Sequence, residues 1–268
     1  MSRGWVCLMY HEVTGGEPGR SVGSWFAVSR ATFGRHLDAI AAAGRRGCTV
    51  SEAARAGDGA RVAITFDDGT IDHYQNAFPE LVAHGMSATF FVVTTRVGQP
   101  GYVSWDQLRE MRKAGMEIGS HTRTHPFLSE LDAAALEREV GGARAEIDAA
   151  LGQETVALAL PGGDAPRRAL RPLLGAAGYR VVATSRWGTN RVGPEGAGGR
   201  QVAWIRRATV RGAADAAEFG RILAADPSLA ALRRARESAL GSLRRFLGPS
   251  RYARWRRAFL GVVRRVLP

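Results

Sequence analysis

Val62-Ala63-Ile64-Thr65-Phe66-Asp67-Asp68-Gly69 is the stretch of sequence that decides how this 268-residue chain folds. Its first five residues form a mostly apolar run, which is typical of a short buried strand. The run ends in two adjacent carboxylates, so both lie at the carboxyl end of the predicted strand. Because neighbouring side chains on an extended segment point to opposite sides, Asp67 and Asp68 cannot easily bind one ion together. The two carboxylates therefore need different roles.

A second polar cluster, His121-Thr122-Arg123-Thr124-His125, follows about fifty residues further on. A zinc-type divalent cation binds a carboxylate and two neutral imidazoles and keeps a fourth position open for a water that it acidifies. Asp68, His121 and His125 meet that demand. We expect Zn²⁺ at this site, with other divalent transition metals as alternatives. Asp67 is left to act as the general base that takes the proton of the attacking water.

Strand and helix signals alternate around these clusters. We expect strands at residues 5–10, 62–66, 88–93, 116–120, 156–160 and 179–185, and helices at 30–43, 74–84, 105–114, 132–151 and 168–177. Strands separated by helices of this length predict a parallel sheet with right-handed crossovers, and a closed barrel explains the placement best. In such barrels the chemistry gathers at the carboxyl ends of the strands, where His11, Asp67, Asp68 and His121 fall.

Charge is distributed unevenly along the chain. The formal net charge is +12, but residues 229–268 carry eleven Arg and one Glu, a net of +10, which leaves +2 for residues 1–228. We therefore expect one barrel domain over 1–228 and an Arg-rich helical extension over 229–268. Two cysteines, Cys7 and Cys48, give no disulfide framework. The chain begins without the apolar region of an export signal, which predicts a cytoplasmic location.

Three stretches carry a resemblance to a known family: Ile64–Gly69, Ala88–Val92 and Gly119–His125 with Leu128. They resemble the polysaccharide deacetylases of carbohydrate esterase family 4, also called the NodB-homology fold, and the likeness runs from about Trp5 to about Ala225. The resemblance implies an α/β fold of the distorted (β/α)7 TIM-like barrel type. It also implies that Asp67 is the base, that Asp68, His121 and His125 bind the metal, and that the substrate is an N-acetylated amino sugar.

Amide hydrolysis also needs an acid for the departing amine. Most relatives place a His in a late Leu-x-His motif, but no His follows His125 in this chain. The stretch Met9-Tyr10-His11-Glu12-Val13 is similar to an N-terminal Tyr-His motif of the exopolysaccharide deacetylase branch. That similarity implies that His11 supplies the acid and that Tyr10 lines the substrate site. The alternative is that His11 only forms a hydrogen bond within the barrel rim.

The family's third motif, Arg-x-Pro-x-Gly, lacks its Arg here, because the matching stretch is Ala159-Leu160-Pro161-Gly162-Gly163. In the family this Arg keeps the base ionised, and an unpartnered buried carboxylate has a raised pKa. Arg207 lies in Ile205–Val210, which resembles a Leu-Pro-Arg-Ile stretch of the exopolysaccharide branch, and is a candidate to replace it. Pro161, Gly162 and Gly163 would let the backbone approach the substrate, with a main-chain N–H near the oxyanion.

The C-terminal extension has the pattern of a basic amphipathic helix. Apolar residues recur at spacings of three and four, and Arg residues occupy other positions; the apolar set is Tyr252, Trp255, Phe259, Val262 and Val266. Such a helix binds an anionic membrane surface, although it is too short and too charged to span one. The alternative is packing against the barrel or a second subunit. We expect no nucleic-acid binding, because no recognised module accompanies the charge.

These patterns together predict a metal-dependent enzyme that removes an N-acetyl group from an amino sugar of a glycan, glycolipid or lipid-linked precursor. We expect it in the cytoplasm, with the extension holding it peripherally at the inner membrane face. Two other functions stay open: a C–N hydrolase, such as a deformylase or cyclic amidase on a small or lipid-linked amide, and a noncatalytic glycan or membrane adaptor. The sequence leaves open the sugar, the acyl group, the metal and the oligomeric state.

Overall fold

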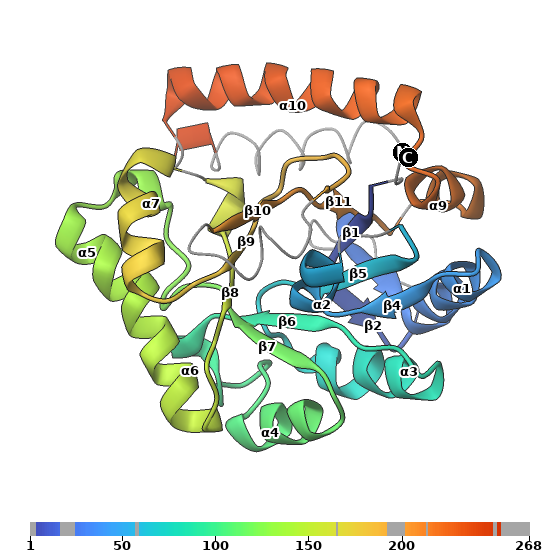
Figure 1. The fold of residues 1–268 in the computed structure, drawn as a ribbon, viewed down its shortest axis with the longest axis horizontal. Helices are drawn as coiled ribbons and strands as arrows, with labels where there is room; N and C mark the ends of the chain where they lie inside the picture. The colour runs from blue at the N-terminus through green and yellow to red at the C-terminus, as the bar shows by residue number, and fades with distance from the viewer. Residues whose placement is uncertain are drawn as a thin grey trace.

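The computed structural model describes residues 4–16, 25–56, 59–164, 166–191, 202–212, 214–248 and 251–252. Its main feature is a nine-stranded sheet in the order β10-β9-β8-β7-β6-β5-β1-β11, with β4 beside β5 (Figure 1). The strands are β1 Val6–Tyr10, β4 Arg46–Cys48, β5 Arg61–Phe66, β6 Thr89–Val92, β7 Glu117–Ser120, β8 Ala157–Ala159, β9 Val181–Ala183, β10 Ala203–Ile205 and β11 Ala208–Thr209. Neighbouring strands pair in parallel throughout this sheet.

The two ends of the sheet are joined by one extended segment. Only Arg206 and Arg207 separate β10 from β11, and β10 pairs with β9 whereas β11 pairs with β1. With β10 and β11 taken together, seven strands form the ring in the described part of the chain, and β4 lies beside the first half of β5. The predicted distorted (β/α)7 barrel is therefore confirmed.

Helices surround the strands, and α10 runs along the side that carries β10 and β11 (Figure 1). The α-helices are α1 Arg30–Ala42, α2 Val50–Ala56, α3 Phe78–Ala83, α4 Trp105–Lys113, α5 Ala133–Glu137, α6 Ala143–Leu151, α7 Arg167–Ala176, α9 Ala216–Leu223 and α10 Pro227–Leu247. Shorter turns are η2 His73–Ala77, η3 Thr94–Arg96, η4 Leu128–Glu130, η5 Arg138–Gly142 and η6 Pro161–Gly163. A separate pair of strands, β2 Glu12–Thr14 and β3 Ala27–Ser29, lies between β1 and α1 in the chain.

Local sequence signals explain where several helices begin. Ser29 precedes α1, and its hydroxyl accepts a hydrogen bond from the N–H of Thr32 at 3.2 Å. Ser104 and Gln107 form a reciprocal capping box at the start of α4, which satisfies donors that the helix itself leaves unpaired. The predicted single helix over 132–151 instead contains the π-helical turn η5 between α5 and α6. Such turns often occur at functional sites.

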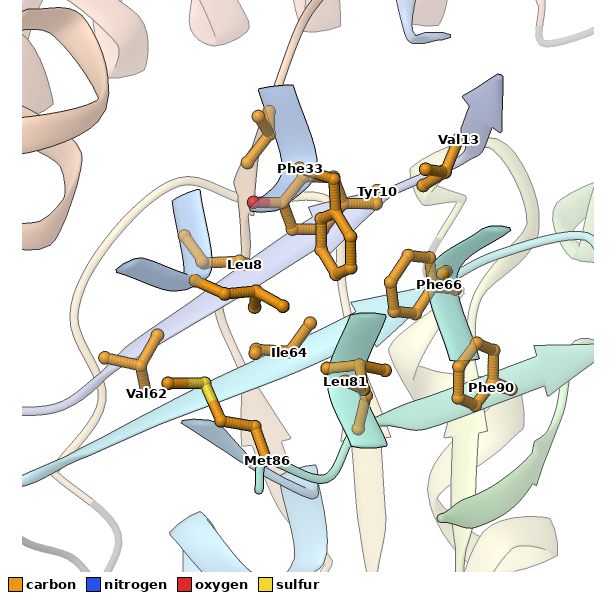
Figure 2. Close-up of a cluster of buried hydrophobic side chains, with 14 of the residues drawn as sticks. Leu8, Tyr10, Val13, Phe33, Val62, Ile64, Phe66, Leu81, Met86 and Phe90 are labelled. Atoms are coloured by element: carbon orange, nitrogen blue, oxygen red, sulfur yellow. The ribbon is translucent and has the colours of Figure 1, made fainter. Parts of the chain in front are cut away.

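The sheet separates apolar clusters on its outer side, here called the outer core, from one cluster inside the barrel. Side chains that point outward from β1, β5 and β6, among them Leu8, Ile64 and Phe90, pack against the surrounding helices (Figure 2). Alternate residues of the same strands, such as Cys7 and Ala63, form a second buried cluster inside the barrel. Because side chains alternate along a strand, the inward series continues to His11 and Asp67 at the carboxyl ends of β1 and β5. The alternation thus aims both side chains into the mouth of the barrel.

The start of the Arg-rich extension packs on the barrel. The predicted boundary between residues 228 and 229 lies inside α10, and Leu229 and Ala230 are buried in the outer core. Arg233 of α10 donates to the carbonyl of Thr209 in β11 at 3.1 Å. Trp255, Phe259, Val262 and Val266 lie outside the described residues. Among the described helices, none combines the length and apolar character that crossing a bilayer requires.

Candidate metal centre

Three side chains from two strand ends meet at the carboxyl edge of the barrel. Asp68 follows β5, His121 follows β7, and His125 lies four residues further along the same loop. One potential ligand atom from each lies within 4.8 Å of the others. Asp68 Oδ1 is 3.8 Å from Nε2 of His121 and 3.6 Å from Nε2 of His125. The structure therefore brings together the three residues that the sequence assigns to a metal.

A backbone carbonyl fixes the orientation of the His121 imidazole. It is buried, and its Nδ1 lies 2.9 Å from the carbonyl oxygen of Ala159 in β8, to which Nδ1–H donates. That tautomer leaves the lone pair of Nε2 directed toward Asp68. A backbone carbonyl behind a ligating His is a common way to fix ring orientation in metal sites. His121 thus has the surroundings of a metal ligand and not of an ordinary buried His.

The other two ligand positions carry an unusual backbone. Asp68 has φ 81° and His125 has φ 64°, and Thr122 within the histidine loop also has φ 64°. A left-handed conformation is unfavourable for residues other than Gly and persists only where the surroundings enforce it. Here the hydroxyl of Thr122 accepts a hydrogen bond from the N–H of His125 at 3.1 Å. The strained positions coincide with the cluster, which is typical of a functional site.

The donor set fits a zinc-type ion. One carboxylate oxygen and two imidazole nitrogens are the ligands of many catalytic zinc sites, in which water takes the remaining position. Burial, followed by the neighbouring His121, lowers the pKa of His125 to about 4. His125 is therefore neutral at physiological pH, as a ligand must be. Asp68, His121 and His125 are the residues that would hold the ion.

Asp67 is held by Arg207 at the junction of β10 and β11. Arg207 donates from Nη1 to Oδ1 at 2.6 Å and from Nη2 to Oδ2 at 2.8 Å, and both residues are buried. Burial alone would raise the pKa of Asp67, but the Arg207 guanidinium outweighs it and holds this pKa well below its usual range. Arg207 is fixed in turn by the carbonyl of Thr184, 3.0 Å from its Nε. The cation that residues 159–163 lack is thus supplied from another strand.

His11 lies within electrostatic reach of the two carboxylates. Burial lowers the pKa of His11, and the charges of Asp67 and Asp68 oppose that shift. Its ring packs against Phe26 with 4.9 Å between ring centroids. Its Nδ1 is buried and has no hydrogen-bond partner among the described residues. The alternative of a simple rim hydrogen bond through Nδ1 therefore finds no support, and the role of His11 as the acid stays a prediction.

The prediction that Tyr10 lines the substrate site is wrong. Tyr10 is an outward residue of β1, is completely buried, and stacks on Phe66 at 5.4 Å between ring centroids (Figure 2). Its hydroxyl lies 3.1 Å from Nδ1 of His36 in α1. The residue next to an inward-facing His11 must face outward, because successive side chains alternate. Tyr10 is therefore a core residue between the sheet and α1.

The turn η6 lies where the sequence places it, directly after β8. Pro161 is buried, and Gly162 and Gly163 have φ values of 58° and 66°. A Cβ on Gly162 would lie 2.6 Å from the ring of Phe127, so only Gly fits there. The N–H of Gly163 is bonded to the carbonyl of Leu160 at 3.3 Å and is not spare for an oxyanion. Substrate contact by this turn stays a prediction.

Arg96 is a residue beside the cluster that sequence patterns did not single out. It ends the turn η3, which follows β6, and its Nη1 lies 3.9 Å from Oδ1 of Asp68. The guanidinium carbon is 5.5 Å from the ring centroid of Tyr102. One signal was available, because residues that follow a barrel strand gather at the carboxyl edge. The fold is a parallel barrel, and its carboxyl edge carries two histidines and one carboxylate that could hold a metal ion.

Comparison with known proteins shows which family this chain resembles. Residues 54–182 match the family model described as polysaccharide deacetylase. A putative polysaccharide deacetylase, YxkH of Bacillus subtilis (strain 168), is 30% identical over 162 residues, which cover 58% of this chain and 56% of that protein. A chitooligosaccharide deacetylase of Rhizobium leguminosarum bv. trifolii is 34% identical over 31% of this chain and 37% of its own length. Residues 54–182 are therefore similar to polysaccharide deacetylases, and the chain spans about half the length of the Bacillus relative.

Solved structures agree over most of the chain. IcaB from Ammonifex degensii is 27% identical, with a TM-score of 0.68 and coverage of 82% of this chain and 96% of that one. The Streptococcus pyogenes deacetylase PplD, solved in complex with acetate, shares the fold with a TM-score of 0.72 at 22% identity, over 83% of this chain and 99% of its own. His11 and Arg207 lie outside residues 54–182, and the fold brings them to Asp67.

Proposed function

We propose that this protein is a metal-dependent hydrolase that removes an N-acetyl group from an amino sugar of a glycan, glycolipid or lipid-linked precursor. The observation that carries the proposal is one arrangement at the barrel mouth. Asp68, His121 and His125 form a compact ligand set, and the adjacent Asp67 is buried and bonded through both oxygens to Arg207. A ligand set beside a separately held carboxylate is what metal-assisted amide hydrolysis requires.

Asp67 and Asp68 divide the chemistry between them. When bound at Asp68, His121 and His125, a divalent ion would acidify a water and polarise the amide carbonyl. Asp67 stays ionised because Arg207 lowers its pKa, so a carboxylate oxygen is available to accept the proton of the attacking water. Arg207 also fixes the direction of this carboxylate, which favours one approach of the water.

His11 completes the proposed reaction by giving a proton to the departing amine. His11 continues the alternate residues of β1 that point into the barrel, and the charges of Asp67 and Asp68 both act on its ring. Burial favours the neutral ring; a proton that reaches His11 after water attack is therefore readily passed on to a more basic amine nitrogen. The amine leaves neutral, and Asp67 stays bound to Arg207 throughout.

The substrate class rests on the relatives. One is named a chitooligosaccharide deacetylase and others are chitin deacetylases or a peptidoglycan-N-acetylglucosamine deacetylase. Those names share an N-acetylated amino sugar as the group acted on, which supports an amino-sugar glycan or lipid-linked sugar as the substrate here. The particular sugar, the acyl group and the metal are left to experiment.

The decisive experiment measures acetate and formate release from a panel of N-acetylated and N-formylated amino sugars, with zinc-loaded protein. We expect acetate from the wild-type protein and none from Asp67→Asn, which should still bind zinc because Asp67 is not a ligand. Normal turnover by Asp67→Asn would show that the assigned base is wrong. Formate as the main product would favour a deformylase, and full zinc occupancy without any hydrolysis would favour an adaptor.

We also propose that residues 229–268 contact an anionic membrane surface. Their net charge of +10 supports this, as do Leu232 and Phe246 of α10, which are 69% and 87% exposed. Co-sedimentation with vesicles should be strong for phosphatidylserine mixtures, weak for phosphatidylcholine alone, and reduced by salt. Equal binding to both vesicle types, or none, would refute it. The cytoplasmic location stays a prediction.

A further inference from the structure

The two histidine ligands are held in very different ways. The ring of His121 is fixed by its hydrogen bond to the carbonyl of Ala159. The main-chain N–H of His121 donates to the carbonyl of Val92 in β6 at 2.8 Å. The ring of His125 has no hydrogen bond among the described residues and contacts Asp68 and the His121 ring. Its direction therefore depends on the backbone of residues 122–125, which contains two left-handed residues.

One carboxylate binds the middle of that backbone. Oε2 of Glu139 accepts hydrogen bonds from the main-chain N–H of Arg123 at 3.0 Å and of Thr124 at 2.8 Å. Its Oε1 accepts from the hydroxyl of Thr124 at 2.7 Å. Three donors from two consecutive residues thus converge on one half-buried side chain. Bonds to a carboxylate are stronger than bonds between neutral groups, so Glu139 holds this part of the loop firmly.

The other contacts of Arg123 do not bind the main-chain N–H groups that Glu139 binds. Glu146 accepts from the side chain of Arg123 at 2.6 Å, and Thr95 donates its N–H to the carbonyl of Arg123 at 3.1 Å. Neither uses the N–H groups of residues 123 and 124. Among the described residues, these two donors have Glu139 as their partner. Glu139 lies in η5, where the π-helical turn interrupts the helix beside the loop.

We propose that Glu139 is a positioning residue of the metal centre, which holds the His121–His125 loop so that His125 meets Asp68 and His121 at ligand distance. The inference deepens the proposed function, because it concerns the same metal ligands. Without Glu139, Arg123 and Thr124 lose the three hydrogen bonds that hold the loop between its two left-handed residues. His125 then samples orientations that cannot bind the ion, and metal affinity falls by the fraction of time spent in them.

The test measures zinc affinity by competition with a chromogenic chelator. Glu139→Ala should weaken zinc binding about 10–100-fold, the range found for residues that orient ligands. Glu139→Gln keeps an acceptor for the two main-chain donors and should lose only a few-fold. Glu137→Ala is the matched control, because Glu137 is an exposed carboxylate at the end of α5, two residues away, and should bind zinc as the wild-type protein does. Unchanged affinity in Glu139→Ala would overturn the inference.

A second measurement needs no metal. In metal-free Glu139→Ala, hydrogen exchange of the amides of Arg123 and Thr124 should speed up at least tenfold, with little change in β5 to β7. Unchanged exchange at these amides would overturn the inference even if Glu139→Ala bound zinc poorly through a general loss of stability. Wild-type protein that binds zinc but releases no acetate would refute the proposed function alone. Acetate release by the wild type together with unchanged zinc affinity in Glu139→Ala would refute the positioning role alone.

Discussion

Replacing Arg207 with Met removes the partner of Asp67 while keeping a side chain of similar length inside the barrel. Arg207 is completely buried and Asp67 is 3% exposed, and two hydrogen bonds of 2.6 and 2.8 Å join them. Breaking a buried ion pair from one side costs about 3–5 kcal/mol, because the remaining charge is left without compensation. We therefore expect Arg207→Met to lose about 3–5 kcal/mol of unfolding free energy at neutral pH, together with most of its acetate release.

A double-mutant cycle separates this pair from ordinary packing. Asp67→Asn removes the charge that Arg207 compensates, so Arg207→Met should cost less in that background than in the wild type, with a coupling energy of at least about 1 kcal/mol. Unfolding free energies come from urea titrations of the four proteins. Arg206→Met is the control, because Arg206 is the exposed neighbour in the same segment. A cost for Arg207→Met below about 1 kcal/mol, or zero coupling to Asp67→Asn, would refute the account of this pair.

Three further predictions concern the fold and the metal. Burial, with a smaller effect of Arg35, lowers the pKa of His36 to about 4. Because the unfolded chain then binds more protons than the folded chain between pH 6.5 and 4, the free energy of unfolding should fall by about 3 kcal/mol as the pH is lowered across this window. His36→Phe should show a smaller fall in urea titrations at each pH. Gly119→Ala would place a Cβ 2.6 Å from the ring of Phe91 and should cost about 1–3 kcal/mol, whereas Gly141→Ala, with open space around it, should cost nothing by thermal melting. Removing metal with a chelator should abolish acetate release, and zinc should restore it in the wild type but not in His121→Ala; full activity in chelator would argue against a metal-dependent reaction.

The metal cluster was accessible from the sequence because parallel barrels follow one rule. Residues at the carboxyl ends of strands meet at one edge, so Asp68 and His121 could be placed together without knowing their distance. His125 followed because it is four residues from His121. The contact of Arg207 with Asp67 is different, since 140 positions separate the two residues. Only the resemblance to a family with a similar Arg suggested it, and no periodicity or spacing carries that information.

Tyr10 shows where pattern reasoning fails. The run Val6–Tyr10 is buried on both faces of the sheet, so no polar residue marks which side chains point inward. The motif around Tyr10 and His11 names two neighbours, but alternation allows only one of them to face the site. Once His11 is inward, Tyr10 belongs to the outer core. The error came from treating a motif as a unit when the strand divides it between two environments.

Short and irregular elements were also missed. Strands β10 and β11 have three and two residues, too few for a reliable period. The π-helical turns η2 and η5 keep the overall pattern of a helix, so the sequence over 132–151 predicts one helix. The position of Glu139 depends on such a turn, and its partners are main-chain N–H groups. Backbone partners leave no signature in the sequence, which is why the structure was needed to find it.

The central claim is that one divalent ion binds to Asp68, His121 and His125. Anomalous diffraction at the zinc absorption edge, from crystals grown with stoichiometric zinc, tests it most directly. The account predicts a single strong peak at bonding distance, about 2.0–2.2 Å, from a carboxylate oxygen of Asp68 and the Nε2 atoms of both histidines. No peak there in zinc-containing crystals, or zinc bound elsewhere, would contradict it.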